Sequence, residues 1–326
     1  MTEARRIGSV GPMWPPEFDE RNDRVKGFYL GVVGSWMELN PLLEELLEAG
    51  ERSEASRITG RFLVRDGSGI DFGEARIPLT ERWAGHRLLY FGRNGEERYA
   101  PQSAEEPGIK SEEDELVGEA MKFGRIVTKE AADKRLMEQG MEFSILERPS
   151  DEDIDALVDI YAATYQAFTI PLDHDGVRGL AMDPRNLVGV VRQASTGRIV
   201  SVGIAETHLE MVRDGTRSRG FKFAELSEAA THPHYAKKGL YTAVGVHLLR
   251  RLADGGFDLA YGEARACDYG VNKACMNMGR SFSGRLLKHC RISGDREVPE
   301  EGPYENLNVW AITYDKLKEL FGTNKK

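Results

Sequence analysis

The sequence has no long uninterrupted hydrophobic run. Across its 326 residues, nothing approaches the roughly 18 consecutive apolar residues that a membrane-spanning helix requires. Hydrophobic residues make up 40% and charged residues 30% of the chain, which is typical of a globular protein. No apolar stretch follows Arg5 and Arg6, so we expect no secretory signal, no membrane partner and a cytoplasmic location.

Cysteine is also scarce. The chain holds three cysteines, Cys267, Cys275 and Cys290, and an odd number confined to the last third argues against a disulfide framework. His232 and His234 could be imagined as zinc ligands with Cys267 or Cys290, but their spacing matches no standard zinc pattern. We therefore expect reduced thiols and no metal. A cysteine nucleophile stays open, although nothing in the local sequence favours it.

An excess of positive charge is lacking as well. There are 44 Lys and Arg residues against 53 Asp and Glu residues, which leaves a net charge of −9. Nucleic-acid phosphates would be repelled unless basic side chains were gathered on one face. We predict no nucleic-acid partner.

The length of the chain predicts about two domains. Between residues 56 and 99, the turn dipeptides Asp66-Gly67 and Asn94-Gly95 follow short apolar runs, which is typical of β-hairpins. A helix with Asn40 as its cap is expected from Pro41. Residues 101–115 are rich in Glu, Ser, Pro and Gly and indicate a linker. We predict a small β-rich accessory domain, with a leading arm and the linker, over residues 1–115, and a larger domain over residues 116–326.

The larger domain alternates predicted strands with predicted helices. Hydrophobic periodicity and capping residues predict helices at 119–139, 151–165, 240–253 and 270–278. Strands are expected at 143–146, 187–191, 199–207, 221–230, 259–263, 282–288 and 307–312. Strands mixed with crossover helices predict an α/β (α+β) fold, with a mixed sheet flanked by helices.

One junction in this domain carries chemistry. The run from Phe223 to Leu240 leads from a strand through a tight turn, which contains Gly239, directly into a helix. Backbone N–H groups at a helix start lack intrahelical partners and lie at the positive end of the helix dipole, so they can bind a pyrophosphate. Glycine permits a phosphate to approach the backbone closely.

The order of elements from Met141 to Ile312 resembles the GNAT superfamily of N-acetyltransferases, and the turn resembles the acetyl-CoA pyrophosphate loop of that family. The family loop usually begins with Arg or Gln followed by Gly, whereas this chain has Ala236 and Lys237 there. The resemblance implies acetyl-CoA as the co-substrate and no metal. It assigns the cofactor to Ala230, Thr231, His232, Ala236, Lys237, Lys238, Gly239, Leu240, Tyr241 and Asn272.

Segments on both sides of the loop resemble the β-lysine N-acetyltransferases, which make the compatible solute Nε-acetyl-β-lysine. In chain order these segments are YQAFTIPLD at 165–173, ARACDYGVN at 264–272, GRLLKHCRISG at 284–294 and ENLNVW at 305–310. The resemblance covers roughly the last 180 residues. It implies an N-acetyltransferase, with β-lysine as the leading substrate.

Acetyl transfer from a thioester needs a base for the amine, an N–H donor for the oxyanion and a proton for the thiolate. We predict Glu228 as the base and keep Glu225 as the alternative, because a spacing of three places them on opposite faces of a regular strand. A backbone amide at 230–232 is the expected oxyanion donor. The family's tyrosine acid matches Met276 here, so Tyr269 or water is expected to substitute, or the thiolate leaves unassisted.

An amino-acid substrate also needs a partner for its carboxylate and a pocket for its chain. Arg265, Arg285 and Arg291 lie in the family-like segments, and arginine suits bidentate carboxylate binding. Tyr165 and Phe168 are candidates to line the amine pocket, although aromatic residues at helical spacing are also common in cores.

Three functions remain open at this point. The first is acetylation of a small primary amine, the second is a non-catalytic acyl-CoA-binding regulatory module, and the third is acetylation of a protein lysine. The altered loop and Met276 motivate the second. A homodimer is possible, and the sequence does not assign a role to the β-rich domain.

Overall fold

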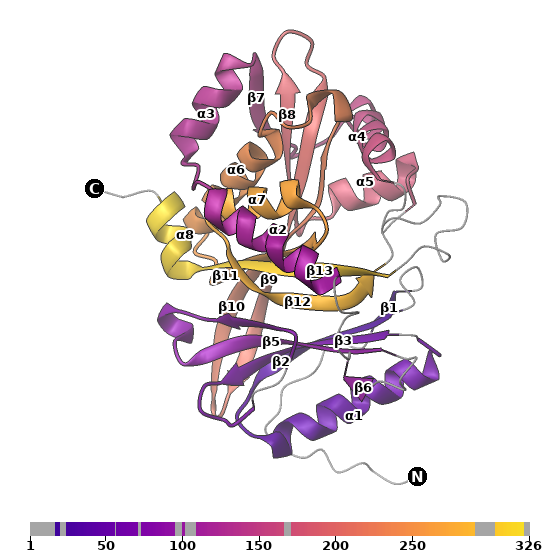
Figure 1. Cartoon of the computed structure of the whole chain (residues 1–326), viewed down its shortest axis with the longest axis vertical. Coiled ribbons are helices and arrows are strands. Elements are labelled where there is room, and N and C mark those ends of the chain that lie inside the picture. Colours follow the sequence, from indigo (N-terminus) through magenta and orange to yellow (C-terminus); the bar gives the residue numbers. More distant parts are fainter. Residues whose placement is uncertain are drawn as a thin grey trace. The chain divides into compact units, whose positions relative to one another are not determined.

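The computed structural model describes residues 17–19, 24–55, 57–70, 73–94, 100–101, 109–165, 171–290 and 304–322. The chain divides into two units, each described here by itself (Figure 1). The first comprises Met1–Ala104 and Leu209–Phe221, and the second comprises Glu105–His208 and Lys222–Lys326. The expected division between residues 115 and 116 falls inside helix α2 (Ile109–Phe123). We therefore propose a domain boundary nearer residue 104.

The first unit is a small mixed sheet with one helix on it. The connection through α1 lets β2 and β3 pair in parallel, whereas β1 with β2, β3 with β5 and β4 with β5 are antiparallel. Leucines of α1 pack against apolar residues of β3 to form the core. The elements are β1 (Glu17–Asp19), β2 (Arg24–Val33), α1 (Trp36–Arg52), β3 (Arg57–Arg65), β4 (Ala75–Pro78), η2 (Glu81–Trp83), β5 (His86–Asn94) and β6 (Ala100–Pro101).

Two local predictions in this unit are corrected. Helix α1 begins at Trp36 after Ser35, so Pro41 lies inside the helix and not in its first turn. The leucines that follow Pro41 bury one face of the helix, and this packing offsets the single N–H that proline removes. Asp66 and Gly67 do form a turn, but β3 pairs with β5 and not with the next strand, so the turn does not close a hairpin. Gly95 lies outside the described residues.

The second unit is a mixed α/β sheet with helices on both faces, as predicted. The strand order is β12-β13-β11-β10-β9-β8-β7, with β10 and β11 parallel because α6 connects them. The elements are α2, α3 (Lys129–Glu138), β7 (Met141–Ile145), α4 (Asp151–Thr164), α5 (His174–Met182), β8 (Asn186–Gln193), β9 (Ile199–Asp214), β10 (Arg217–Thr231), η4 (Pro233–Tyr235), α6 (Leu240–Asp254), β11 (Leu259–Arg265), α7 (Tyr269–Asn277), β12 (Ser281–Cys290), β13 (Glu305–Thr313) and α8 (Tyr314–Phe321).

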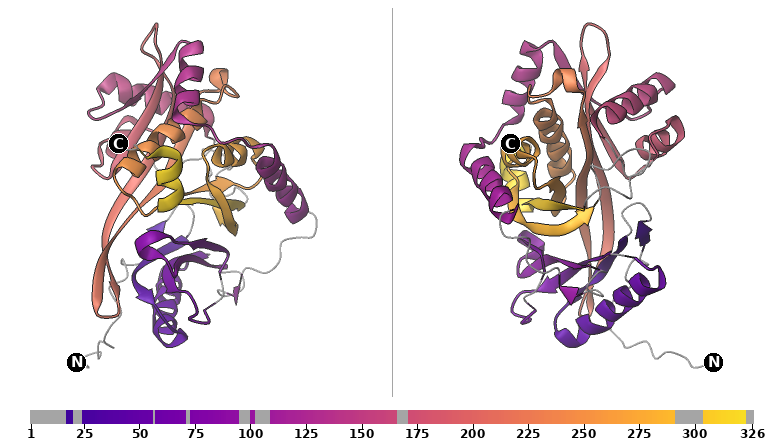
Figure 2. Two further views of the ribbon diagram at one scale, coloured as in Figure 1. Left: turned by 90° about the vertical axis from the view of Figure 1, so that its left-hand side faces the viewer. Right: turned by 45° about the vertical axis from the view of Figure 1, so that its right-hand side comes forward.

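Helices cover the two faces of this sheet with separate cores (Figure 2). The core on one face joins α3, α6, α7 and α8 to the sheet, and includes Leu136, Leu248 and Leu317. The core on the other face joins α4 and α5 to the sheet, and includes Ile154, Leu157 and Val177. A side chain of the sheet can therefore be assigned to the α6 face or to the α4 face by the core that it joins.

Sequence periodicity missed three features of the second unit. The helix expected at 119–139 is two helices, because Thr128 caps the Ala131 amide and starts α3 anew. Helices α5 and α8 were not predicted. Strands β9 and β10 are also longer than expected, and they continue as one hairpin whose distal part, Leu209–Phe221, is counted with the first unit.

Candidate functional site

Strands β10 and β11 stop pairing partway along their length. Their parallel register runs from Phe223 and Leu259 to Glu225 and Tyr261. Beyond that pair β10 continues to Thr231, while β11 continues along β13. The predicted phosphate loop follows β10 directly. The last six residues of β10, from Leu226 to Thr231, therefore run towards the loop without pairing with β11.

A β-bulge interrupts β10 at Glu228. Glu228 has a φ of +46°, in the left-handed region that a regular strand does not use. Ala224 and Leu226 belong to the core under α6, whereas Ala230 belongs to the core under α4. A regular strand would place these even-numbered residues on one face, so the strand changes face between Leu226 and Ala230.

The bulge changes the expectation for the two candidate bases. Glu225 points to the other face of β10 from Ala224 and Leu226. Its Oε2 accepts a hydrogen bond of 3.0 Å from the Tyr261 hydroxyl. Glu228 lies at the bulge itself, and its carboxylate is close enough to Tyr161 and Tyr165, on the α4 face, to raise the pKa of both hydroxyls. A bulge lets both glutamates occupy one face of the strand, and no turn residue in the sequence marks one here.

Two tyrosines of α4 and its carboxyl end reach the bulge. The Tyr161 hydroxyl donates to the Glu228 carbonyl oxygen at 3.0 Å, and the Tyr165 hydroxyl donates to the Ala229 carbonyl oxygen. Burial, with the nearby Glu228 carboxylate, raises the pKa of both tyrosines above the usual value. These tyrosines stay protonated and hold the bulge. Tyr161 was not among the site residues predicted from the sequence.

The loop before α6 has the backbone expected of an anion-binding nest. Lys237 has a φ of +62° and Gly239 a φ of +75°, so two left-handed residues lie in the last turn before the helix. Within the described part of the chain, the backbone amides of residues 237–242 donate no hydrogen bond outside the helix. They remain available to a phosphate. The Ala236 N–H is not available in this way, because it donates to the Pro233 carbonyl oxygen.

Side chains around the loop add positive charge and limit the oxyanion candidates. The Lys238 ammonium lies 5.0 Å from the centre of the Tyr235 ring. The His232 N–H already donates to the Val200 carbonyl oxygen, which argues against it among the three candidate oxyanion donors at 230–232. Burial, then nearby Arg198, lowers the pKa of His232, so its ring is neutral near pH 7.

Asn272 occupies the centre of a buried network. Its Nδ2 donates to the carbonyl oxygens of Arg265 and Asp268 at 2.8 and 2.7 Å. Its Oδ1 accepts from Asn308 Nδ2 at 2.9 Å and from Trp310 Nε1 at 2.8 Å. All the hydrogen-bonding capacity of this side chain is used. This favours a structural role, joining β11, α7 and β13, over the predicted contact with the cofactor.

The two predicted substrate arginines that are described already hold protein carboxylates. Arg265 binds Glu305 through Nε at 2.6 Å and through Nη2 at 3.0 Å. Arg285 lies 2.9 Å from Asp114 and 3.4 Å from Glu113 through Nη1. Both pairs favour a structural role over binding a substrate carboxylate. Glu113 and Asp114 belong to α2, so these pairs join α2 to β12.

The remaining predicted residues divide between described and undescribed segments. Tyr269 begins α7 and lies under the Lys273 ammonium, 5.4 Å from the ring centre. Met276 faces Gly124 at the end of α2. Phe168 and Arg291 lie outside the described residues. Tyr261 was not predicted as a site residue. Its hydroxyl reaches the Glu225 carboxylate because β10 and β11 are neighbouring strands.

Replacing Gly239 with alanine should weaken cofactor binding. A side chain at a φ of +75° strains the backbone by about 1 to 2 kcal/mol, and relief of that strain would turn the loop amides away from a phosphate. We expect acetyl-CoA affinity to fall about tenfold, as measured by calorimetry. Gly197→Ala is the matched control, because Gly197 has a φ of +71° in a turn away from the loop. Equal affinities for the two variants would contradict the prediction.

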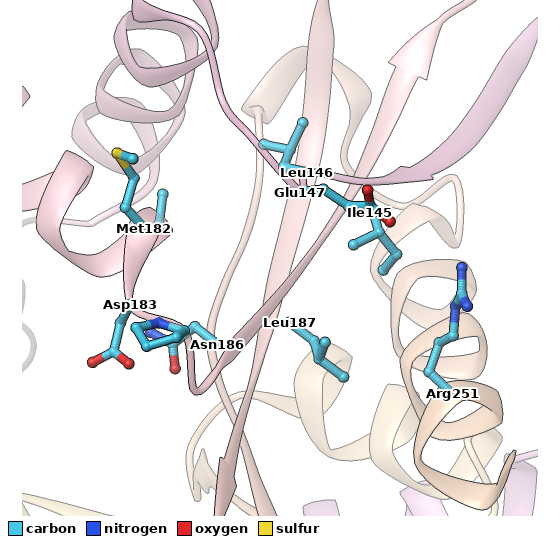
Figure 3. Close-up of a pocket in the computed structure, with 10 residues that line it drawn as sticks. Ile145, Leu146, Glu147, Met182, Asp183, Asn186, Leu187 and Arg251 are labelled. Carbon is cyan, nitrogen blue, oxygen red and sulfur yellow. The ribbon is translucent and has the colours of Figure 1, made fainter. Parts of the chain in front are cut away.

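Within the described residues, no three His, Cys, Asp or Glu side chains gather as a metal site would require. No helix in the same set of residues is long and apolar enough to cross a membrane. A hollow of about 330 Å³ lies elsewhere, and it contains none of the predicted site residues. Figure 3 shows its lining, with Glu147, Asp183 and Arg251 among apolar side chains.

The chain is similar to N-acetyltransferases in sequence. A curated relative is the β-lysine N(6)-acetyltransferase of Methanosarcina mazei, 26% identical over 159 residues that cover 49% of this chain and 51% of that protein. The chain thus spans about half the length of the curated relative it matches. The predicted resemblance to β-lysine N-acetyltransferases is confirmed by this match. No family model matches the chain.

Solved structures of N-acetyltransferases also align with the chain. Arabidopsis thaliana NAA60 in complex with acetyl-CoA is 12% identical, covers 54% of this chain and 99% of its own, and gives a TM-score of 0.43. A variant of the spermidine N-acetyltransferase of Vibrio cholerae is 13% identical, covers 55% of this chain and 96% of its own, and gives a TM-score of 0.38.

Proposed function

We propose that this protein transfers the acetyl group of acetyl-CoA to the primary amine of a small amino acid or amine, with β-lysine as the leading substrate and Nε-acetyl-β-lysine as the product. The observation that carries the proposal is the nest at Lys237 and Gly239, which lies between the unpaired end of β10 and the start of α6. The similarity to a β-lysine acetyltransferase supports the choice of amine.

The loop binds the cofactor in this proposal. Free amides at 237–242 and the positive end of the α6 dipole hold the pyrophosphate, and Lys237 and Lys238 add charge. The nest supplies its hydrogen-bond donors from the backbone. Ala236, in place of the family's Arg or Gln, therefore removes one side chain and keeps the backbone donors. The thioester then lies near the Glu228 bulge.

A carboxylate on the sheet face that α4 covers activates the amine. A lysine-type amine has a pKa near 10.4, so it must lose a proton before it attacks the thioester. Glu228 is our proposed base and Glu225 the alternative, either directly or through water. An N–H of Ala230 or Thr231 stabilises the oxyanion. The amine nitrogen bonds to the carbonyl carbon, and the C–S bond breaks.

The test is release of free CoA from acetyl-CoA with a panel of amines, namely β-lysine, α-lysine, ornithine, polyamines and a lysine-containing peptide. Selective turnover of β-lysine is the expected result, and it would support a role in making a compatible solute. Turnover of the peptide alone would replace the proposal with a protein acetyltransferase. Binding of acetyl-CoA with no turnover of any amine would replace it with a non-catalytic acyl-CoA-binding module.

A further inference from the structure

Arg280 is a buried cation without a carboxylate partner among the described residues. Its residue surface is 1% exposed, and it lies between α7 and β12 in the core under α6. Its Nη2 donates to the Tyr241 hydroxyl at 3.3 Å, and the Cys275 thiol lies beside it. Its Nε and Nη1 have no hydrogen-bond partner in the described part of the chain.

A charge in this situation is costly. Removing a guanidinium from water is repaid only by an ion pair or by full hydrogen bonding, and Arg280 has neither within the described residues. Arg285, whose side chain is 8% exposed, shows the usual solution, because two carboxylates of α2 lie within 3.4 Å of it. With no carboxylate beside it among the described residues, the Arg280 guanidinium is a buried cation that can bind an anion supplied by a ligand.

The position of the guanidinium shows where that anion would lie. A Cβ on Gly262 would come within 2.6 Å of Arg280 Nη1 and within 2.5 Å of the Leu226 carbonyl oxygen. Leu226 and Gly262 directly follow Glu225 and Tyr261, the last pair before β10 and β11 separate. Tyr241, the hydrogen-bond partner of Arg280, is in the first turn of α6 after the phosphate loop. Arg280 therefore lies between the loop and the point where the strands separate.

We propose that Arg280 binds the sulfur of CoA and stabilises the thiolate that leaves during acetyl transfer. This inference rests on the proposed function. The amine nitrogen forms a bond to the acetyl carbon, the C–S bond breaks, and its electron pair goes to sulfur as a thiolate. The amine proton goes to the carboxylate base, and the thiolate stays paired with the guanidinium until solvent protonates it on release.

The proposal answers a chemical need of this chain. Met276, at the position where an acid was sought, cannot donate a proton, and it faces α2. An arginine stays protonated at any pH at which the protein is folded, so it neutralises a thiolate without a proton transfer. Gly262 leaves room for the Arg280 guanidinium, because the side chain of any larger residue there would collide with the guanidinium and with the Leu226 carbonyl oxygen.

The experiment measures the pKa of the CoA thiol bound to the protein, from the ultraviolet absorbance of the thiolate. In the wild-type complex this pKa should lie below that of free CoA by about one unit or more, since one unit is a tenfold preference for the thiolate. Arg280→Met should return it to the value of free CoA and lower kcat about 10- to 100-fold with little change in KM. Arg280→Lys should keep part of the shift.

Two controls separate the possible failures. Desulfo-CoA, which lacks the sulfur, should bind wild type and Arg280→Met equally. Arg250→Met is the matched variant, because Arg250 pairs with Asp254 on the surface of α6 and should leave the thiol unchanged. A bound CoA thiol with the pKa of free CoA in the wild-type protein overturns the role of Arg280, whatever the stability of the variants. Failure of the wild type to bind CoA overturns the proposed function itself.

Discussion

Glu228→Gln should lower kcat/KM for the preferred amine by about 10²- to 10⁴-fold, which is the usual contribution of a general base. Glutamine keeps the size and the hydrogen-bonding oxygen of the side chain but cannot accept the amine proton. Acetyl-CoA affinity should change little, because the amides that we propose as pyrophosphate donors belong to residues 237–242. Steady-state kinetics against pH, together with calorimetry of cofactor binding, measure both quantities.

Glu225→Gln is the matched variant for this prediction. It removes the carboxylate that accepts the Tyr261 hydroxyl, on the same strand and on the same face as Glu228. We expect it to lower kcat/KM by less than Glu228→Gln does. The opposite order would transfer the role of base to Glu225, and equal, small effects would exclude both carboxylates. A variant with reduced acetyl-CoA affinity would indicate a disturbed loop in place of a lost base.

Asn272→Leu should lower the free energy of unfolding by about 3 to 5 kcal/mol. Leucine fills a similar volume but leaves the carbonyl oxygens of Arg265 and Asp268, and the donors of Asn308 and Trp310, buried without their partner. An unsatisfied buried polar group costs about 1 to 3 kcal/mol, and some of the four will find other partners. Urea denaturation followed by circular dichroism gives the value.

Asn277→Ala is the control for the network. The Asn277 side chain accepts one hydrogen bond, from the Arg125 amide at 2.7 Å in an exposed position. Its loss should cost about 1 kcal/mol, the usual net value of a single hydrogen bond. A similar small loss for Asn272→Leu would mean that the network does not stabilise the fold, and the predicted cofactor contact of Asn272 would then regain support.

The sequence determined the elements of the second unit well where hydrophobic periodicity and caps agree. Ser150 caps α4 through a reciprocal bond with Asp153, and Gly239 begins α6 in the left-handed conformation expected of a glycine there. The phosphate loop follows from the same local chemistry, because strand, turn and helix are contiguous in the chain. The resemblance to an N-acetyltransferase also depends on motifs that are contiguous.

The sequence did not predict the contacts between segments that are far apart in the chain. A one-residue bulge at Glu228 reverses the faces of β10, yet no turn residue marks it. The expected linker is partly helix α2, whose Glu113 and Asp114 meet Arg285 far along the chain. Asn272, Arg265 and Arg285 were interpreted one at a time as ligand-binding residues, because their partners become visible only when β11, β12 and β13 are adjacent.

The sequence by itself thus determined the local parts of this protein: its helix caps, most of its strands, the strand–turn–helix at the proposed phosphate loop, and the class of enzyme that it resembles. The tertiary structure decided the partners. It paired two arginines with carboxylates, filled the capacity of Asn272, brought Tyr161 and Tyr165 to the Glu228 bulge, and left Arg280 as a buried cation without a carboxylate among the described residues. Local propensity acts over a few residues, whereas charge pairing and burial depend on which segments the folded sheet makes neighbours.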